Sequence, residues 1–242
     1  MAQLQVHQFP ALSDNYGFLI HDAEAGVTAS IDAPEEGAVQ KALAETGWAL
    51  THILTTHHHA DHTQANAPLK AATGCMIVGP KPEASKVPGI DLALGEGDTF
   101  DFGGHIAKVF ETPGHTLGHI VYHFADDGIC FAGDTLFPLG CGRVFEGTMD
   151  QMWSSMEKMA ALPPETVVYS AHEYTQANAA FAVTVEPDNA ALKARAAEID
   201  KLRADGLPTV PTTMAVEMET NPFVRAGSAA RFAEVRKAKD NF

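Results

Sequence analysis

The segment 56–62 constrains this chain more than any other stretch. It reads Thr-His-His-His-Ala-Asp-His and follows an apolar run directly. Imidazole and carboxylate groups are the usual ligands of borderline metals, and both bind in their deprotonated forms. Because side chains alternate in direction along extended backbone, we expect His57, His59 and Asp61 to face one way and His58 the other. The pattern predicts one cluster that serves two adjacent metals.

The position of this segment argues against the ordinary explanations of a histidine run, which are purification tags and disordered metal-binding tracts. The run is internal, is interrupted by Ala60 and Asp61, and lies between a predicted strand and a predicted helix. His62 follows Asp61 directly and can start a second group of ligands beside the first. The spacing and its context together favour a metal site.

Composition limits the class of protein. With 242 residues, 45% hydrophobic and 19% charged, the chain is typical of a soluble globule of one large domain, or of one domain with a small appendage. Its start lacks the basic and apolar regions of a secretory signal, and no run reaches the length of a membrane-spanning helix. Three cysteines without C-x-x-C spacing indicate reduced core thiols. We therefore expect a cytoplasmic protein with no membrane partner.

The formal charge of −15 is spread unevenly along the chain. In residues 190–242, nine Lys and Arg residues face seven Asp and Glu residues, so this segment is net positive while the rest is strongly negative. Nucleic-acid binding depends on neutralising phosphates, so we expect no nucleic-acid partner. An anionic small substrate would find positive charge in the C-terminal segment.

Short apolar or alternating runs predict strands, and longer periodic runs predict helices, with Gly, Pro and Asp between them. The predicted strands are 16–21, 27–31, 50–55, 75–78, 105–111, 119–124, 129–132 and 167–170. The predicted helices are 35–46, 62–73, 150–161, 175–185, 189–204, 212–219 and 228–239. Strands that alternate with helices favour an α/β fold, and we expect no strand after residue 171. A domain boundary is predicted near residue 174.

Three further candidate ligands share one context, because each follows a predicted strand at its carboxyl end. They are His115, Asp134 and His172. Taken singly, each is more simply a turn residue or a satisfied histidine. However, the first cluster follows its strand in the same way, and strand carboxyl ends are where α/β sheets gather functional groups. Four such loops predict that these side chains form one site. His119 stays open between a neighbour of the ligands and a turn residue.

Through these motifs the chain resembles the metallo-β-lactamase superfamily, and within it the glyoxalase II family of hydroxyacylglutathione hydrolases. The segments typical of the superfamily are 56–62, 112–119 and 133–137. The segments that point to the family, together with the helical tail, are 140–143, 172–175 and 221–225. The resemblance implies an αββα sandwich of two mixed sheets flanked by helices over residues 1–173. It also implies a small all-α substrate-binding domain over 174–242.

The resemblance implies that seven side chains divide between two divalent metal ions. One ion would be held by His57, His59 and His115, the other by Asp61, His62 and His172, and Asp134 would bridge the two. Each ion then has nitrogen and oxygen ligands, no thiolate, and open positions for water or substrate. Zinc is the expected metal, although iron and manganese accept the same ligands.

Such a pair of ions supports hydrolysis. Two ions about 3.5–4 Å apart share a water and lower its pKa from about 15.7 toward about 7, which gives a hydroxide that attacks an acyl carbonyl. A thiolate leaves without a strong general acid, because its thiol has a pKa of about 8.5. Asp61 and Asp134 would act as ligands, with no separate side-chain base. No G-x-S-x-G elbow or Cys–His pair indicates covalent catalysis.

The resemblance implies a glutathione thioester as substrate: S-(2-hydroxyacyl)glutathione, above all S-D-lactoylglutathione, cleaved to D-lactate and glutathione in methylglyoxal detoxification. The residues expected to bind it are Arg143, Phe145, Tyr174, Arg236 and Lys239. Arg236 and Lys239 lie three apart on one predicted helix face. Phe145 stands where the family often has tyrosine, so one hydroxyl contact is missing there.

Two other classes of protein stay open. A mononuclear-iron persulfide dioxygenase of the same superfamily would bind one iron and consume oxygen. A zinc-stabilised binding protein would hold saturated metal and hydrolyse no thioester, but structural zinc sites are normally rich in sulfur, which this ligand set lacks. We expect a monomeric hydrolase.

Overall fold

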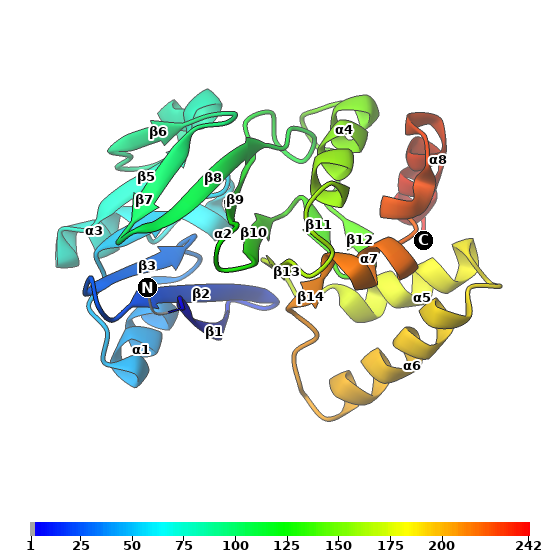
Figure 1. Cartoon of the computed structure of the whole chain (residues 1–242), viewed down its shortest axis with the longest axis horizontal. Helices are drawn as coiled ribbons and strands as arrows, with labels where there is room; N and C mark the ends of the chain where they lie inside the picture. Colours follow the sequence, from blue (N-terminus) through cyan, green and yellow to red (C-terminus); the bar gives the residue numbers. More distant parts are fainter. Residues whose placement is uncertain (1–2) are drawn as a thin grey trace. The chain divides into compact units, whose positions relative to one another are not determined.

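The structure, a computed structural model, describes residues 3–242 and contains two six-stranded sheets (Figure 1). The strands of the first sheet, in spatial order, are β1 (Gln5–Ala11), β2 (Asn15–Asp22), β3 (Val27–Ile31), β4 (His52–Leu54), β5 (Met76–Pro80) and β6 (Leu92–Leu94). Strands β1 to β3 pair antiparallel, whereas β3 to β6 pair parallel, so the sheet is mixed.

The strands of the second sheet, in spatial order, are β14 (Thr212–Thr213), β13 (Val167–Ser170), β10 (Ile129–Gly133), β9 (Ile120–Phe124), β8 (His105–Glu111) and β7 (Thr99–Phe102). A short hairpin joins β11 (Leu136–Phe137) to β12 (Gly140–Cys141). The helices are α1 (Glu36–Thr46), α2 (Ala60–Thr63), α3 (Asn66–Thr73), η1 (Lys81–Lys86), α4 (Met149–Ala160), α5 (Thr175–Val185), α6 (Ala190–Ala204), α7 (Met214–Thr220), η2 (Val224–Ala226) and α8 (Ala229–Asp240).

The predicted architecture of sheets flanked by helices is confirmed, as is the helical character of the C-terminal segment. The bounds of β3, β8, β13 and α5 match the prediction residue for residue. The single predicted helix 62–73 is divided into α2 and α3. The prediction that no strand follows residue 171 is wrong, because β14 pairs antiparallel with β13. A two-residue strand is too short to show alternation.

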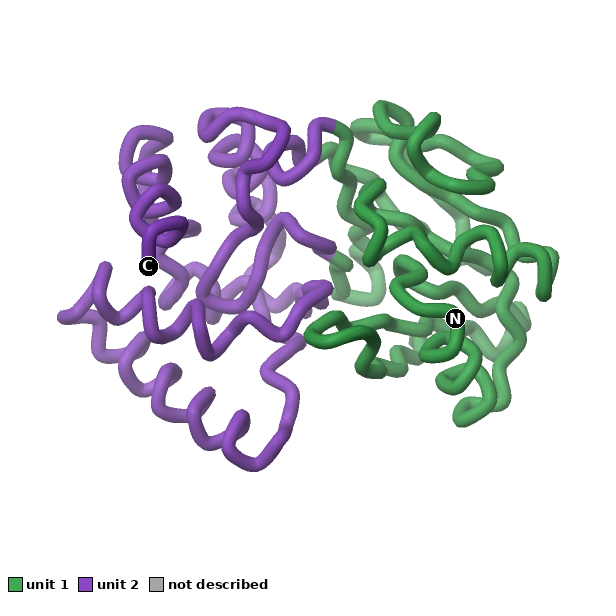
Figure 2. Tube along the Cα trace, turned by 180° about the vertical axis from the view of Figure 1, so that it is seen from behind, with its two compact units in different colours: residues 1–111, 118–131 green, residues 112–117, 132–242 purple. Residues whose placement is uncertain are grey.

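The chain divides into two compact units (Figure 2). The first unit holds residues up to 111 and 118–131, and the second unit holds 112–117 and 132–242. The domain boundary near residue 174 stays a prediction. Within residues 3–242, none of the helices has the length and apolar character that crossing a membrane requires.

The core of the first unit holds the start of the histidine-rich segment in place. Phe9, Leu19, Ile53, Leu69 and Ile77 are buried in one cluster. Burying a side chain of this kind contributes about 1.5–3 kcal/mol, so the short strand β4 is firmly anchored although it has only three residues. The residues that follow β4 therefore leave the sheet from a fixed point.

In the second unit, a separate cluster joins helices to the β11–β12 hairpin. Leu139, in the hairpin turn, is fully buried with Ala179, Ala182, Leu192 and Ile199. The last four residues lie on α5 and α6. Apolar contact with two helices therefore fixes the turn that follows Asp134.

Candidate metal centre

The histidine-rich segment begins at a buried carboxylate. Asp32, which directly follows β3, accepts hydrogen bonds from the Thr56 amide (2.7 Å) and the Thr56 hydroxyl (2.9 Å). Because β3 and β4 are parallel neighbours, Asp32 and Thr56 leave the sheet at the same edge. The first residue of the segment is therefore fixed on both its backbone and its side chain.

The four predicted ligands of the first unit lie close together. Nε2 of His57 is 3.1 Å from Nδ1 of His59, and Nε2 of His62 is 3.4 Å from Oδ2 of Asp61. Ligand atoms of His57 and His62 lie within 4.8 Å of each other. Asp61 and His62 fall in the first turn of α2, whereas His59 precedes it in extended backbone. This change from extended to helical backbone brings together four candidate ligands from six residues.

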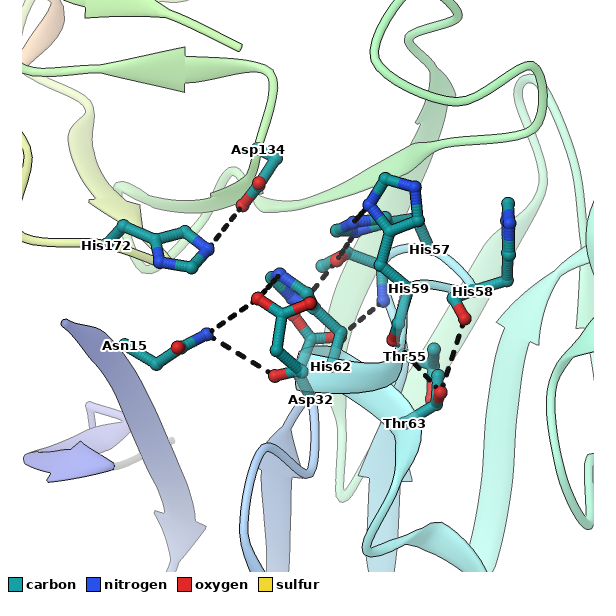
Figure 3. A network of polar contacts seen from close by, with 12 residues as sticks. Asn15, Asp32, Thr55, His57, His58, His59, His62, Thr63, Asp134 and His172 are labelled. Carbon is teal, nitrogen blue, oxygen red and sulfur yellow. Dashed lines mark hydrogen bonds and ion pairs between the residues drawn. The ribbon is translucent and has the colours of Figure 1, made fainter. Parts of the chain in front are cut away.

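Two polar neighbours orient these ligands (Figure 3). Asp32 Oδ2 lies 2.7 Å from Nδ1 of His62, so the other ring nitrogen of His62 is the one available to a metal. The Asn15 amide donates to the Asp61 carboxylate (3.1 Å) and to the Asp61 carbonyl (3.3 Å). Carboxylate–histidine pairs of this kind typically fix the tautomer of a metal-binding imidazole.

Sequence reasoning missed Asp32 and Asn15. Asp32 directly follows a predicted strand at its carboxyl end, which is the same signal that selected His115, Asp134 and His172. A single aspartate between a strand and a nearby proline (Pro34) is more simply a turn residue, so the pattern alone does not select Asp32. Asn15 starts β2 and carries no such signal, since its contact with Asp61 joins residues 46 positions apart.

His58 and His119 differ from the ligands in their surroundings. Nδ1 of His58 lies 2.9 Å from Glu83, and the His58 amide donates to the same carboxylate oxygen. The other oxygen of Glu83 accepts from the Gly118 amide at 2.7 Å. His119 is fully buried and stacks on His57, with ring centroids 4.7 Å apart. His119 is therefore a neighbour of the ligands.

In the second unit, Asp134 lies between two imidazoles. Its Oδ2 is 3.3 Å from Nε2 of His115, and its Oδ1 is 3.4 Å from Nε2 of His172 (Figure 3 shows the second contact). All three residues are buried. A carboxylate that presents a different oxygen to each of two histidines has the geometry expected of a bridging ligand.

His115 and His172 each make a second contact, on the part of the ring that does not face Asp134. Nδ1 of His115 lies 2.9 Å from the carbonyl oxygen of Arg143, so it is the donor and Nε2 is left toward Asp134. The ring of His172 stacks on the ring of Tyr174, with centroids 4.7 Å apart and planes 3° apart. Each imidazole therefore presents Nε2 to the Asp134 carboxylate.

The residues predicted to bind substrate all belong to the second unit. Phe145 is 60% exposed and its ring lies 5.2 Å from that of His115. Arg143 is exposed, 3.5 Å from Asp240. Arg236 is buried, and donates to the Cys141 carbonyl (2.9 Å) and to Asp240 (3.0 Å).

Lys239 differs from the two arginines in its contacts. Its Nζ donates to the Ala177 carbonyl at 2.9 Å, a contact with a neutral group. Burial lowers the pKa of Lys239, and the positive charge of Arg236 lowers it further. An anionic ligand near Lys239 would therefore offset an unfavourable environment for the ammonium group.

The cysteines are not candidates for a nucleophile or for metal ligands. All three are free and buried. Burial raises the pKa of the Cys130 thiol to about 12, and it raises that of Cys141 to about 11 although Arg236 opposes the shift. Both thiols therefore stay protonated near neutral pH, which makes them poor nucleophiles and poor metal ligands.

Comparison with known proteins assigns the chain to a superfamily. Residues 24–172 match the model described as metallo-beta-lactamase superfamily, and residues 173–242 match that of the hydroxyacylglutathione hydrolase C-terminus. The crystal structure of ETHE1 from Myxococcus xanthus has a TM-score of 0.74 and 28% identity, and the match covers 96% of this chain and 90% of that one. The chain therefore belongs to the metallo-beta-lactamase superfamily.

Curated relatives narrow the assignment. The chain is 57% identical over 256 residues to the hydroxyacylglutathione hydrolase of Rhizobium meliloti, with 100% of both chains covered. It is 52% identical over 254 residues to that of Brucella ovis, with 99% of both covered. Within the superfamily, the chain belongs to the hydroxyacylglutathione hydrolases, the glyoxalase II family.

Proposed function

We propose that the chain is a binuclear metal hydrolase that cleaves S-(2-hydroxyacyl)glutathione, and S-D-lactoylglutathione in particular. The products are a 2-hydroxy acid, D-lactate, and glutathione, which is the second step of methylglyoxal detoxification. The observation that carries the proposal is the identity of 57% over the full length of a hydroxyacylglutathione hydrolase. The three free cysteines favour a reducing compartment, so we further infer a cytoplasmic protein. We also propose that it acts as a monomer.

We assign seven side chains to the metal pair. His57, His59 and His115 hold one ion, Asp61, His62 and His172 hold the other, and Asp134 bridges them. The donors fit divalent zinc, because all are imidazole nitrogens or carboxylate oxygens. The contacts of Asp32 with His62 and of the Arg143 carbonyl with His115 support the assignment, since each leaves one ring nitrogen for a metal. Iron or manganese would accept the same donors.

When bound, the metal pair supplies a hydroxide at neutral pH and stabilises the negative charge that develops on the carbonyl oxygen. Asp61 and Asp134 serve this chemistry as ionised ligands. Asn15 keeps Asp61 in place through two hydrogen bonds. The leaving glutathione thiolate needs no proton from a side chain, because its thiol has a pKa of about 8.5.

For glutathione recognition, we assign Arg143, Phe145, Tyr174, Arg236 and Lys239. Tyr174 is 38% exposed and stacked on His172, so its hydroxyl is held at a fixed distance from a proposed ligand. Phe145 offers an exposed ring beside His115 without a hydroxyl. Lys239 is the best partner for a glutathione carboxylate, because its contact with Ala177 does not neutralise its charge.

Replacing Lys239 by alanine tests this assignment. We expect KM for S-D-lactoylglutathione to rise about 10- to 100-fold, because a charge-assisted hydrogen bond contributes about 1.5–3 kcal/mol. The metal content should be unchanged. Thiol release measured over a range of substrate concentrations gives both KM and kcat. Lys237→Ala is the matched control, since Lys237 is exposed on the same helix.

Arg236→Ala should also raise KM, and in addition it should lower thermal stability, because Arg236 is buried and packs over Phe223. An unchanged KM in both Lys239→Ala and Arg236→Ala would contradict the glutathione assignment. Purified protein with both metals bound that releases no thiol from this thioester would contradict the function as a whole.

A further inference from the structure

The family-specific segment 221–225 contains none of the proposed ligands or substrate contacts. Its first residue, Asn221, is fully buried at the end of α7. The Asn221 amide donates to the carbonyls of Phe137 (3.2 Å) and Gly140 (3.0 Å), and to the carboxylate of Glu217 (2.9 Å). The two carbonyls flank the turn of the β11–β12 hairpin, more than 80 residues earlier in the chain.

The turn itself is strained. Leu139 has a φ of 58°, in the left-handed region that leucine rarely adopts. Its amide donates to Glu217 at 2.9 Å, and the carbonyl of Pro138 accepts from the Asn178 amide at 3.2 Å. Asn178 on α5, Glu217 on α7 and Asn221 at the end of α7 therefore make hydrogen bonds with backbone groups of residues 137–140. Such backbone persists only where its surroundings fix it.

The two ends of this hairpin reach the proposed ligands of the second unit. Asp134 precedes the hairpin by two residues, and Arg143, whose carbonyl orients His115, follows it by two. The Gly142 amide donates to the Thr135 carbonyl at 3.2 Å. A Cβ atom at Gly142 would lie 1.9 Å from the carbonyl oxygen of Asp134, so the two ends are in close contact. A shift of the turn would therefore displace Asp134 and the partner of His115 together.

Glu217 is held in turn by the C-terminal segment. Its second carboxylate oxygen accepts hydrogen bonds from the Arg195 guanidinium on α6 and from the Thr212 hydroxyl in β14. Arg195 also donates to the Thr220 hydroxyl at 2.6 Å. Glu217 is fully buried, and both of its carboxylate oxygens accept hydrogen bonds. The network gives the hairpin turn a rigid support.

We propose that Asn221 and Glu217 are positioning residues of the metal centre. They fix the β11–β12 turn and thereby set Asp134 and the carbonyl that orients His115. The C-terminal segment would then position the metal ligands in addition to binding the substrate. This inference rests on the proposed function, because the ligands that it orients are those assigned to the metal pair.

Zinc affinity tests the inference, with Zn²⁺ alone as the probe and a chelating dye as competitor. In Asn221→Ala, we expect the affinity for at least one zinc ion to fall about 10- to 100-fold, the usual effect of removing an outer-shell partner. We expect kcat to fall with it and KM to stay unchanged. Asn189→Ala is the matched control, because Asn189 caps α6 and contacts Leu192, Glu186 and Glu219 instead of the turn. It should lose thermal stability but keep the wild-type zinc affinity.

Asn178→Ala gives a second measurement if Asn221→Ala fails to fold. Asn178 lies inside α5, where alanine is favoured, and the change removes the contact with Pro138. We expect a several-fold loss of zinc affinity. Wild-type affinity in the folded variants, or an equal loss in Asn189→Ala, would overturn the inference. A wild-type chain that binds zinc but hydrolyses no thioester would overturn the proposed function alone, and its zinc affinity would still test the roles of Asn221 and Glu217.

Discussion

Replacing Asp134 by alanine is expected to lower kcat/KM for S-D-lactoylglutathione by at least about a thousandfold, because the loss of the proposed bridging ligand would remove the activation of water. Asp134 presents one carboxylate oxygen to His115 and the other to His172. Alanine would remove both contacts at once. Thiol release measures the rate, and elemental analysis of the purified variant should show that less than the full metal content is retained.

Asp150→Ala is the control for this experiment. Asp150 is exposed in the first turn of α4 and belongs to the same unit of the chain. Its replacement should leave both the rate and the metal content unchanged. If Asp134→Ala kept its kcat/KM within tenfold of the wild type, Asp134 would not be a bridging ligand.

The second large effect is expected from Asp32→Asn. The amide side chain has the same size but lacks the charge, and its nitrogen cannot accept the hydrogen bonds that Asp32 Oδ2 shares with His62 and Thr56. Loss of such an outer-shell carboxylate typically costs about 10- to 100-fold in metal affinity or activity. We therefore expect kcat/KM and zinc affinity to fall within that range, measured by thiol release and by competition with a chelating dye.

Asp127→Asn separates a specific effect from a general loss of stability. Asp127 is also a buried carboxylate paired with a histidine, since its Oδ2 lies 2.9 Å from Nδ1 of His105. Neither residue is a proposed ligand. This control should lower the thermal stability but leave zinc affinity as in the wild type. A similar loss of zinc affinity in the two variants would show that Asp32 has no particular role at the metal centre.

Much of the candidate site was predictable because its ligands come from local patterns. The segment 56–62 carries four of the proposed ligands within its own length, and the strands before His115 and His172 were predicted with their observed bounds. His115 follows its strand by four residues and His172 by two, so the strand end brings both near the same edge of the sheet. The contacts that orient the ligands were not predictable, because they join distant positions, as Asn15 with Asp61 and Asn221 with Gly140 do.

A proline and short strand length explain the strands that were not predicted. Strand β1 contains Pro10, which argues against a strand, but β1 is an edge strand, where proline is tolerated. Strands β6, β11, β12 and β14 have three residues or fewer, and β7 (Thr99–Phe102) has four, so they form through pairing and not through a local pattern. The break between α2 and α3 lies at Gln64 and Ala65. Pro68 follows Gln64 by four residues and cannot donate a hydrogen bond to its carbonyl, so proline favours a new helix start here, a signal that the predicted helix 62–73 overlooks.

The central claim is that seven imidazole and carboxylate side chains hold two metal ions that drive thioester hydrolysis. Metal content per chain, measured together with thiol release from S-D-lactoylglutathione, tests it most directly. We predict two divalent ions per chain, loss of hydrolysis when a chelator removes them, and recovery when zinc is returned. One iron per chain with oxygen consumption, as in a persulfide dioxygenase, would contradict the claim.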